Sequence, residues 1–203
     1  DVKRMSRVTQ TPCKVIQNGL HYRCKRERTM SDIIQKALLF ATEAHGKQMR
    51  KYTGEPYIVH PVEVMSIVKS VVSDEEVLAA ALLHDVVEDT PAVVADISQH
   101  FGSRVASLVD ELTDRSVLTD GNRKVRKEID RSRLASASAE AQTVKLADLI
   151  SNTRSIVEHD PNFAKIYMAE KALLLKVLVR GNKELFAKAS ALVVAYEKDV
   201  KKL

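Results

Sequence analysis

The stretch that decides the fold spans residues 77–89 and reads VLAAALLHDVVED. Its first seven residues place an apolar side chain on every face of a helix, which is typical of a helix buried at the centre of a domain. Ser73 or Asp74, just upstream, has the side-chain oxygen that an N-cap residue needs. The sequence therefore predicts a short central helix with the rest of the chain packed around it.

The second half of the same stretch carries four ionisable side chains, His84, Asp85, Glu88 and Asp89. Such groups are costly at the end of a buried helix unless they are paired or bind a metal ion. On a continuous helix, His84 and Glu88 share one face, and Asp85 and Asp89 share the adjacent face. Imidazole beside carboxylate is a ligand set for a divalent metal. The alternative is a histidine that caps the helix C-terminus, followed by acidic residues exposed in a turn.

The flanking sequence predicts further helices and no β-structure. A one-sided apolar pattern begins after Ser31 or Asp32 and stops near Gly46, and His60-Pro61 opens a second helix. Further helices are expected after Pro91 and after Gly102. Four more are expected over residues 123–137, 140–158, 162–179 and from 183 onward. We therefore predict an all-α fold, a helical bundle.

A second polar cluster lies within the helix expected over residues 140–158. Its apolar side chains fall within an arc of about 120°, whereas four polar ones fall within about 80° of a different arc: Lys145, Asp148, Asn152 and Ser155. Such a row can present a metal-binding carboxylate among hydrogen-bonding groups. An ordinary amphipathic helix with a solvated face is the alternative.

Between the first two helices lies a polar loop, residues 47–57, which runs into His60. It carries Arg50 and Lys51 together with Gly54. Arginine and lysine on a glycine-containing loop suit phosphate oxygens, the former as a planar fork and the latter as a point charge. A solvated turn is the alternative.

These residues together carry a family resemblance. His60, then His84-Asp85, then Asp148 follow the order of the HD-domain metal-dependent phosphohydrolases. The sequences HDVVED at 84–89 and KLADLISN at 145–152 are similar to the hydrolase domain of RelA/SpoT proteins, and the resemblance covers about residues 31–180. With no length left for a synthetase domain, the chain resembles the single-domain small alarmone hydrolases related to the metazoan SpoT homologue. The resemblance implies the HD-domain helical bundle.

The resemblance also implies the site. His60, His84, Asp85 and Asp148 would ligate one divalent metal ion, usually Mn²⁺ in this family. Glu88 and Asp89 would position or deprotonate the attacking water. Substrate contacts are implied at six positions, which are Arg50, Lys51, Asn152, Lys124, Ser155 and Tyr167. The remaining histidines of the body are expected to cap helices or to lie on the surface: His45, His100 and His159.

The implied reaction removes the 3′-diphosphate of (p)ppGpp, an alarmone of the stringent response, to give GDP or GTP and pyrophosphate. One alternative is another HD phosphohydrolase reaction on a phosphorylated nucleotide, such as removal of the 2′-phosphate of NADPH. Another is a non-catalytic nucleotide-sensing module. A degenerate sensor is expected to have lost a metal or acidic position, and this sequence retains all six, which favours the enzyme.

Composition excludes several classes of protein. The chain has 203 residues, 45% of them hydrophobic, with 6 Gly and 5 Pro, which excludes disorder over its whole length and a collagen-like repeat. No apolar run reaches the roughly 18 residues of a membrane span, so we expect no membrane association. Cys13 and Cys24 cannot form a disulfide scaffold. They favour a reducing compartment, which we take to be the cytoplasm.

The net charge of +5 is unevenly placed along the chain. Residues 1–30 hold eight Lys or Arg against two acidic residues, whereas the rest of the chain carries −1. We predict a basic, poorly structured extension over 1–30 and one phosphohydrolase domain over 31–203. The extension is interpreted as a dispensable tail, an arm for nucleic acid or another acidic partner, or a targeting segment. Nucleic-acid binding is not expected elsewhere, and a homo-oligomer stays open.

Overall fold

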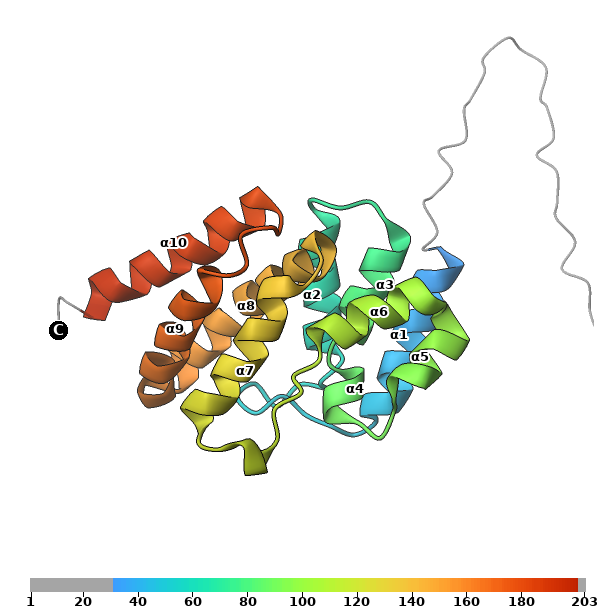
Figure 1. Cartoon of the computed structure of the whole chain (residues 1–203), viewed down its shortest axis with the longest axis horizontal. Helices are drawn as coiled ribbons and strands as arrows, with labels where there is room; N and C mark the ends of the chain where they lie inside the picture. The colour runs from blue at the N-terminus through green and yellow to red at the C-terminus, as the bar shows by residue number, and fades with distance from the viewer. Residues whose placement is uncertain (1–30, 201–203) are drawn as a thin grey trace, which may run out of the picture.

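The computed structural model describes residues 31–200, and Figure 1 shows them as a bundle of helices. These residues form no strand beyond an isolated bridge between Met49 and Pro56, which confirms the all-α prediction. Within the same range, no helix is both long and apolar enough to cross a bilayer. The predictions for residues 1–30 lie outside the described residues. In chain order the helices are α1 (Asp32–His45), α2 (Val59–Lys69), α3 (Glu75–Leu83), α4 (Val86–Asp89), α5 (Val94–Phe101), α6 (Ser103–Leu112), the 3₁₀ turn η1 (Leu118–Asp120), α7 (Arg123–Ser136), α8 (Ala139–His159), α9 (Pro161–Leu175) and α10 (Lys183–Val200).

The apolar stretch forms α3, which is buried along its whole second half. Every residue from Val77 to Leu83 is at most 2% exposed. Asp74 caps the helix, since its side chain accepts hydrogen bonds from the backbone of Glu76 and Val77. α3 packs against α1, α2, α6 and α8, which together cover it. The predicted central helix is confirmed.

The central helix ends earlier than a continuous helix through Asp89 would. α3 stops at Leu83, His84 and Asp85 form a turn, and α4 begins at Val86. A continuous helix would separate two consecutive side chains by about 100°. At this break the side chains of His84 and Asp85 instead converge, with Nε2 of the first 3.1 Å from Oδ2 of the second.

The C-terminal end of α9 also differs, because the helix stops at Leu175 and not at residue 179. Gly181 packs directly against α8, where an added Cβ would lie 2.7 Å from Leu146 and 3.1 Å from the backbone of Gln142. The Gln142 side chain also accepts a hydrogen bond from the backbone of Arg180 at 2.9 Å. The chain leaves the helical path to make these contacts, and local apolar periodicity could not show this.

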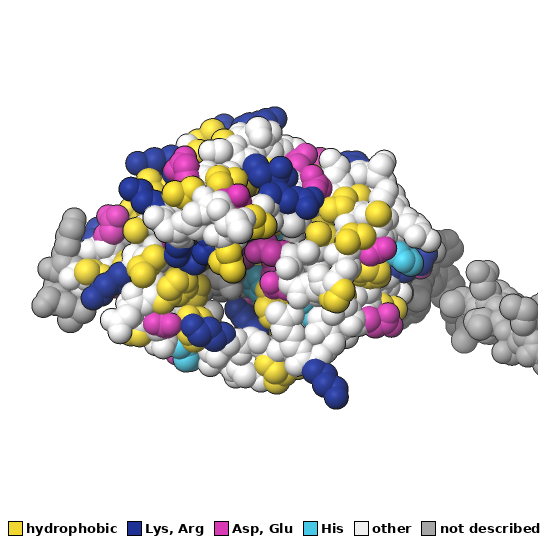
Figure 2. Space-filling model, turned by 60° about the horizontal axis from the view of Figure 1, so that its bottom comes forward, with side chains coloured by type: hydrophobic (Ala, Val, Ile, Leu, Met, Phe, Trp, Pro, Cys, Tyr) yellow, Lys and Arg dark blue, Asp and Glu magenta, His cyan; other side chains and the backbone are white. Residues whose placement is uncertain are grey.

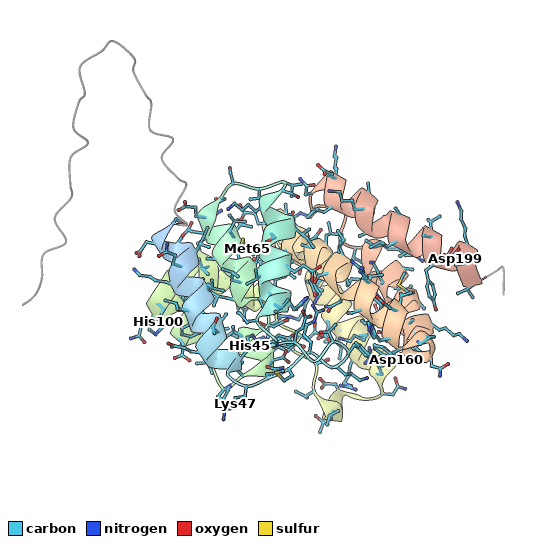
Figure 3. All side chains as sticks on the ribbon, turned by 180° about the vertical axis from the view of Figure 1, so that it is seen from behind. His45, Lys47, Met65, His100, Asp160 and Asp199 are labelled. Atoms are coloured by element: carbon cyan, nitrogen blue, oxygen red, sulfur yellow. The ribbon has the colours of Figure 1, made fainter. Side chains whose placement is uncertain are left out.

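Two smaller predictions near α1 are corrected. Ser31 occupies the N-cap position of α1, but its side chain makes no capping hydrogen bond. His45 lies in the last turn of α1, yet it is 6% exposed and so is not a surface residue. Its ring lies 4.6 Å from that of Tyr57, and Figure 3 shows it where α1 meets the following loop. The other two histidines, His100 and His159, are exposed as predicted.

α8 is the helix that connects the two halves of the bundle. It packs against α2, α3 and α6 and also against α9 and α10. Figure 1 shows α9 and α10 at one end of the molecule and α1 and α5 at the other. Side chains from the middle of α8 therefore lie in the interior beside the end of α3.

Candidate metal centre and active site

Side chains from three parts of the bundle meet at the end of α3. His60 comes from α2, His84 and Asp85 from the turn after α3, and Asp148 from α8. The first three offer donor atoms that all lie within 4.8 Å of one another, a cluster able to hold a metal ion. Asp148 Oδ1 lies 3.3 Å from His60 Nε2 and 3.9 Å from His84 Nε2, so it faces the same point. The structure thus brings all four predicted ligands together.

The two imidazoles fit a divalent metal ion. His60 and His84 are each 2% exposed, and neither Nε2 has a hydrogen-bond partner among the described residues. Buried polar atoms rarely lack a partner. The Nδ1 of His84 donates to the Ala81 carbonyl at 2.8 Å, which leaves the lone pair of the neutral ring on Nε2. Two ring nitrogens and two carboxylates around one point are a ligand set for a divalent metal.

The charges of this cluster hold one another ionised. Burial acts to lower the pKa of His84, but Asp85 and Asp148 outweigh it and raise that pKa to about 9. Burial acts to raise the pKa of Asp85, yet His84 and His60 leave it lowered. The pKa of Asp148 lies well below its usual range, since Lys145 and His60 outweigh its burial. A divalent cation would displace the proton from His84, because a metal ligand must be deprotonated.

In the polar row of α8, Asp148 is buried and the other three residues are partly buried, so the row is not an ordinary solvated face. Asn152 Nδ2 donates to Asp148 Oδ1 at 2.6 Å, and Lys145 Nζ lies 2.9 Å from Asp148 Oδ2. Burial opposes the charge of Lys145, but Asp148, Asp114 and Glu88 raise its pKa. Lys145 is therefore a fixed positive charge that interacts with Asp148, Asp114 and Glu88.

That acidic pair, Glu88 and Asp89, ends α4 and remains exposed. Glu88 Oε2 accepts a hydrogen bond from the backbone of Asp114 at 3.3 Å. Although the residue reaches solvent, partial desolvation and the neighbouring Asp114 raise the pKa of Glu88 to about 7. Partial desolvation and Asp85 also raise the pKa of Asp89. A carboxyl group that titrates near neutrality can both accept and release a proton.

A cavity of about 150 Å³ adjoins Asp148 and lies between α7, α8 and α9. Two predicted substrate residues, Asn152 and Tyr167, line it. Its basic lining residues were not among those predicted, and they are Arg123, Lys127, Arg131, Lys145 and Lys171. Figure 2 shows a hollow on one face of the molecule, with acidic, basic and histidine side chains around it. Cationic groups beside a carboxylate cluster suit an anionic, phosphate-bearing ligand.

The remaining predicted substrate residues lie elsewhere. The guanidinium of Arg50 lies 3.5 Å from Glu63, and the Arg50 side chain is only 11% exposed. Lys51 is 75% exposed and lies 3.6 Å from Asp160, which Figure 3 labels between α8 and α9. Lys124 is exposed, and Ser155 Oγ donates to the Asn152 carbonyl at 3.2 Å. None of these four lines the cavity.

Sequence reasoning missed three residues next to the cluster, which are Tyr57, Ser151 and Lys171. The Tyr57 hydroxyl donates to Asp85 Oδ2 at 2.6 Å, and Ser151 Oγ lies 2.9 Å from His60 Nδ1. Ser151 follows Asp148 by three residues on one helix, so the helical spacing did carry a signal for it. Tyr57 precedes His60 by three residues, but it lies before the first residue of α2, so helical periodicity gave no signal for it. Lys171 lies on α9, a helix that carries none of the four ligands.

Comparison with known proteins gives the class to which this fold and site belong. The HD domain model matches residues 37–174. The chain therefore belongs to the HD-domain family, whose hydrolases are metal-dependent.

More particular relatives lie within that class. The chain is 40% identical over 129 residues to the guanosine-3′,5′-bis(diphosphate) 3′-pyrophosphohydrolase MESH1 of Drosophila melanogaster, covering 62% of this chain and 70% of that protein. It is 50% identical over 80 residues to the guanosine-3′,5′-bis(diphosphate) 3′-pyrophosphohydrolase of Aquifex aeolicus, but these are 39% of this chain and only 11% of that protein. A solved metazoan ortholog of SpoT that hydrolyzes ppGpp superposes with a TM-score of 0.74 and 32% identity, over 82% of this chain and 96% of that one. The chain is thus a homologue of the metazoan SpoT ortholog.

Proposed function

We propose that the chain is a metal-dependent hydrolase that cleaves (p)ppGpp to GDP or GTP and pyrophosphate. Water adds to the phosphorus next to the 3′ oxygen, the bond between them breaks, and the 3′ oxygen leaves with a proton. We assign this activity to the domain over residues 31–203 and to the cytoplasm, as Cys13 and Cys24 favour a reducing compartment. The names of the Drosophila and Aquifex relatives support the reaction.

The observation that carries the proposal is the meeting of His60, His84, Asp85 and Asp148 around two unpartnered buried nitrogens. We propose that these four side chains hold one Mn²⁺. When bound, such an ion polarises a phosphoryl oxygen and lowers the pKa of a coordinated water. Mixed imidazole and carboxylate ligands are compatible with manganese.

Glu88 and Asp89 are proposed to receive and return the proton of the attacking water. The support is the raised pKa of Glu88, about 7, which matches a general base that works near neutral pH. Lys145 interacts with both Asp148 and Glu88 and would offset negative charge as the phosphoryl group is attacked.

The proposed substrate contacts are polar residues of the cavity and of the loop before α2, together with Lys124 and Ser155. Asn152 and Tyr167 line the cavity beside Asp148, and we propose that they contact the nucleotide. Lys51 is exposed on the loop before α2 and is free to turn from Asp160 toward a phosphate. Arg50, Lys124 and Ser155 stay as predicted contacts that the substrate-free arrangement does not bring to the cavity.

The decisive experiment measures turnover of ppGpp, pppGpp and NADPH side by side, with Mn²⁺ and with a chelator. We expect release of pyrophosphate from the guanosine compounds, dependent on Mn²⁺. Phosphate release from NADPH alone would instead establish the 2′-phosphatase. Inactivity toward all three by protein with bound Mn²⁺, together with saturable ppGpp binding, would establish a sensing module and overturn the proposal.

A further inference from the structure

The two imidazoles of the candidate metal centre differ in what holds their other nitrogen. His84 Nδ1 donates to a neutral backbone carbonyl, that of Ala81, at 2.8 Å. His60 Nδ1 instead lies 2.9 Å from the hydroxyl oxygen of Ser151 on α8. That hydroxyl lies 2.7 Å from Glu63 Oε2, one turn beyond His60 on α2. His60 is therefore connected through a hydroxyl to a carboxylate, and His84 is not.

The direction of these hydrogen bonds follows from the chemistry of the groups. An ionised carboxylate has no proton to give, so Ser151 donates to Glu63. The Ser151 oxygen is then left to accept from His60 Nδ1–H. The ring is thereby fixed with its lone pair on Nε2, the atom that is buried without a partner beside Asp85 and Asp148.

Arg50 holds the outer end of this chain of contacts. Its guanidinium lies 3.5 Å from the same Glu63 oxygen that accepts from Ser151. The Arg50 side chain is 11% exposed, whereas its neighbour Lys51 is 75% exposed. Glu63 itself is 48% exposed, so without Arg50 its carboxylate would be free to turn into solvent.

We propose that Ser151, Glu63 and Arg50 are positioning residues that hold the divalent metal through His60. This inference rests on the proposed metal centre and assigns Arg50 a role that does not require substrate. A carboxylate connected to the far nitrogen of a metal-binding imidazole fixes the orientation of the ring and makes it a more basic ligand. Loss of such an outer partner typically weakens metal binding by roughly 10- to 100-fold.

The test measures the dissociation constant of Mn²⁺ in the full chain without nucleotide. Ser151→Ala is expected to raise it by roughly 10- to 100-fold, and Glu63→Gln by a smaller factor, since the amide still accepts from Ser151. The matched control is Thr143→Val, which removes another buried α8 hydroxyl, one that donates to the Ala139 carbonyl away from the cluster. The absorption bands of bound Co²⁺ give a second readout, because altered His60 geometry shifts them.

A second pair of variants separates Arg50 from its neighbour. Arg50→Gln is expected to weaken Mn²⁺ binding several-fold, whereas Lys51→Gln is expected to leave it unchanged. A role for Arg50 in binding phosphate alone would leave the Mn²⁺ affinity of both variants at the parent value, and that result would overturn the inference. Glu63 is half exposed, so Glu63→Gln keeps the test decisive if Ser151→Ala fails to fold.

The outcomes distinguish this inference from the proposed function. Weakened Mn²⁺ binding in Ser151→Ala, in a parent that hydrolyses no nucleotide, would support the outer contacts and reject the reaction. If the parent hydrolyses ppGpp but Ser151→Ala and Glu63→Gln leave the Mn²⁺ affinity unchanged, the reaction is supported and the role of the outer contacts is rejected. A parent that binds no divalent ion would overturn both.

Discussion

Two clusters of ionic groups join α3 to α8, one at each end of α3, and the two clusters differ in kind. Near the N-termini of both helices, Arg104 of α6 reaches Asp74 and Glu76 beside α3 and Glu140 on α8. At the C-terminal end of α3, His84 and Asp85 meet His60 of α2 and Asp148 of α8. Both clusters bring charges from several helices to one point.

The difference lies in exposure and in what each charged atom contacts. The Arg104 side chain is 40% exposed, and its guanidinium bonds three carboxylates directly. The two imidazoles of the other cluster are 2% exposed, and their Nε2 atoms have no hydrogen-bond partner in the described part of the chain. An exposed cluster whose members satisfy one another contributes modestly to stability. A buried cluster with unsatisfied nitrogen atoms fits a site that binds a metal ion.

The largest expected effect comes from Asp148→Asn. The amide keeps the size of the side chain but removes an anionic metal ligand, so Mn²⁺ affinity should fall at least about ten-fold and turnover should be abolished. The helices should remain, because α8 packs through its apolar side, with Leu146 fully buried. Bound metal, nucleotide turnover and the far-ultraviolet circular dichroism spectrum are measured together. If Asp148→Asn keeps the metal content and activity of the parent, the buried cluster is not a metal site and does not differ in kind from the Arg104 cluster.

The double variant Glu88→Gln, Asp89→Asn is expected to have the next largest effect. It leaves the four proposed ligands in place, so Mn²⁺ should still bind, while kcat should fall by about 10² to 10⁴ because a general base is lost. In the parent, kcat should rise with pH up to about the pKa of Glu88, near 7, as the carboxyl loses its proton. The variant should lack that limb. A kcat within a few-fold of the parent at saturating Mn²⁺ would reject the catalytic role of the pair.

The sequence predicted the central helix and the metal ligands better than it predicted the break after α3 and the residues that contact the ligands. α3 was predictable because seven consecutive apolar residues leave no side for solvent, and Asp148 was predictable because it shares an arc of α8 with Lys145 and Asn152. The break after Leu83 was not, because local sequence between 84 and 89 is compatible with a continuous helix. The break is fixed by tertiary packing.

The outer contacts of the site were hidden for the same reason. Glu63 and Ser151 lie 88 positions apart in the chain, and only the packing of α2 against α8 joins them. The predicted phosphate contact of Arg50 stays a prediction, but the sequence carried no signal that the loop places Arg50 beside Glu63. Lys171 was not singled out from the sequence, yet it is 1% exposed.

Lys171 offers a further test of the comparison, because it is a buried cation that bonds no carboxylate within residues 31–200. Its Nζ donates to the Leu149 carbonyl at 3.2 Å and to Thr153 Oγ1 at 2.6 Å. Burial lowers its pKa from 10.5 to about 8, with Asp148 opposing. Between these values the unfolded chain holds a proton that the folded chain has released, so stability should rise with pH across that window.

The full gain amounts to about 3 kcal/mol, at about 1.4 kcal/mol for each pKa unit. Lys171→Met should lack this rise. Urea unfolding at pH 7.5 and at pH 10 measures most of this rise, about 2 kcal/mol, as the difference between parent and variant, which cancels the titration of other groups. Equal changes in the free energy of unfolding for the two proteins would show that Lys171 keeps an ordinary pKa in the fold.

Arg104→Met is expected to have the smallest effect. The three ion pairs are partly exposed, so each is worth at most about 1 kcal/mol, and the methionine retains the apolar part of the stem. We expect the free energy of unfolding to fall by about 1 kcal/mol, or Tm by roughly 2 to 4 °C, with Mn²⁺ affinity and turnover unchanged.

Moderate salt should reduce the difference in stability between parent and variant, because it screens exposed charges. Thermal unfolding at low and high salt, with Mn²⁺ titration of both proteins, tests this. The opposite outcome is a loss of several kcal/mol in the free energy of unfolding that salt does not reduce, or a weakened Mn²⁺ affinity. Either result would mean that the Arg104 cluster is coupled to the metal site through α3 and α8, and the two clusters would then not differ in kind.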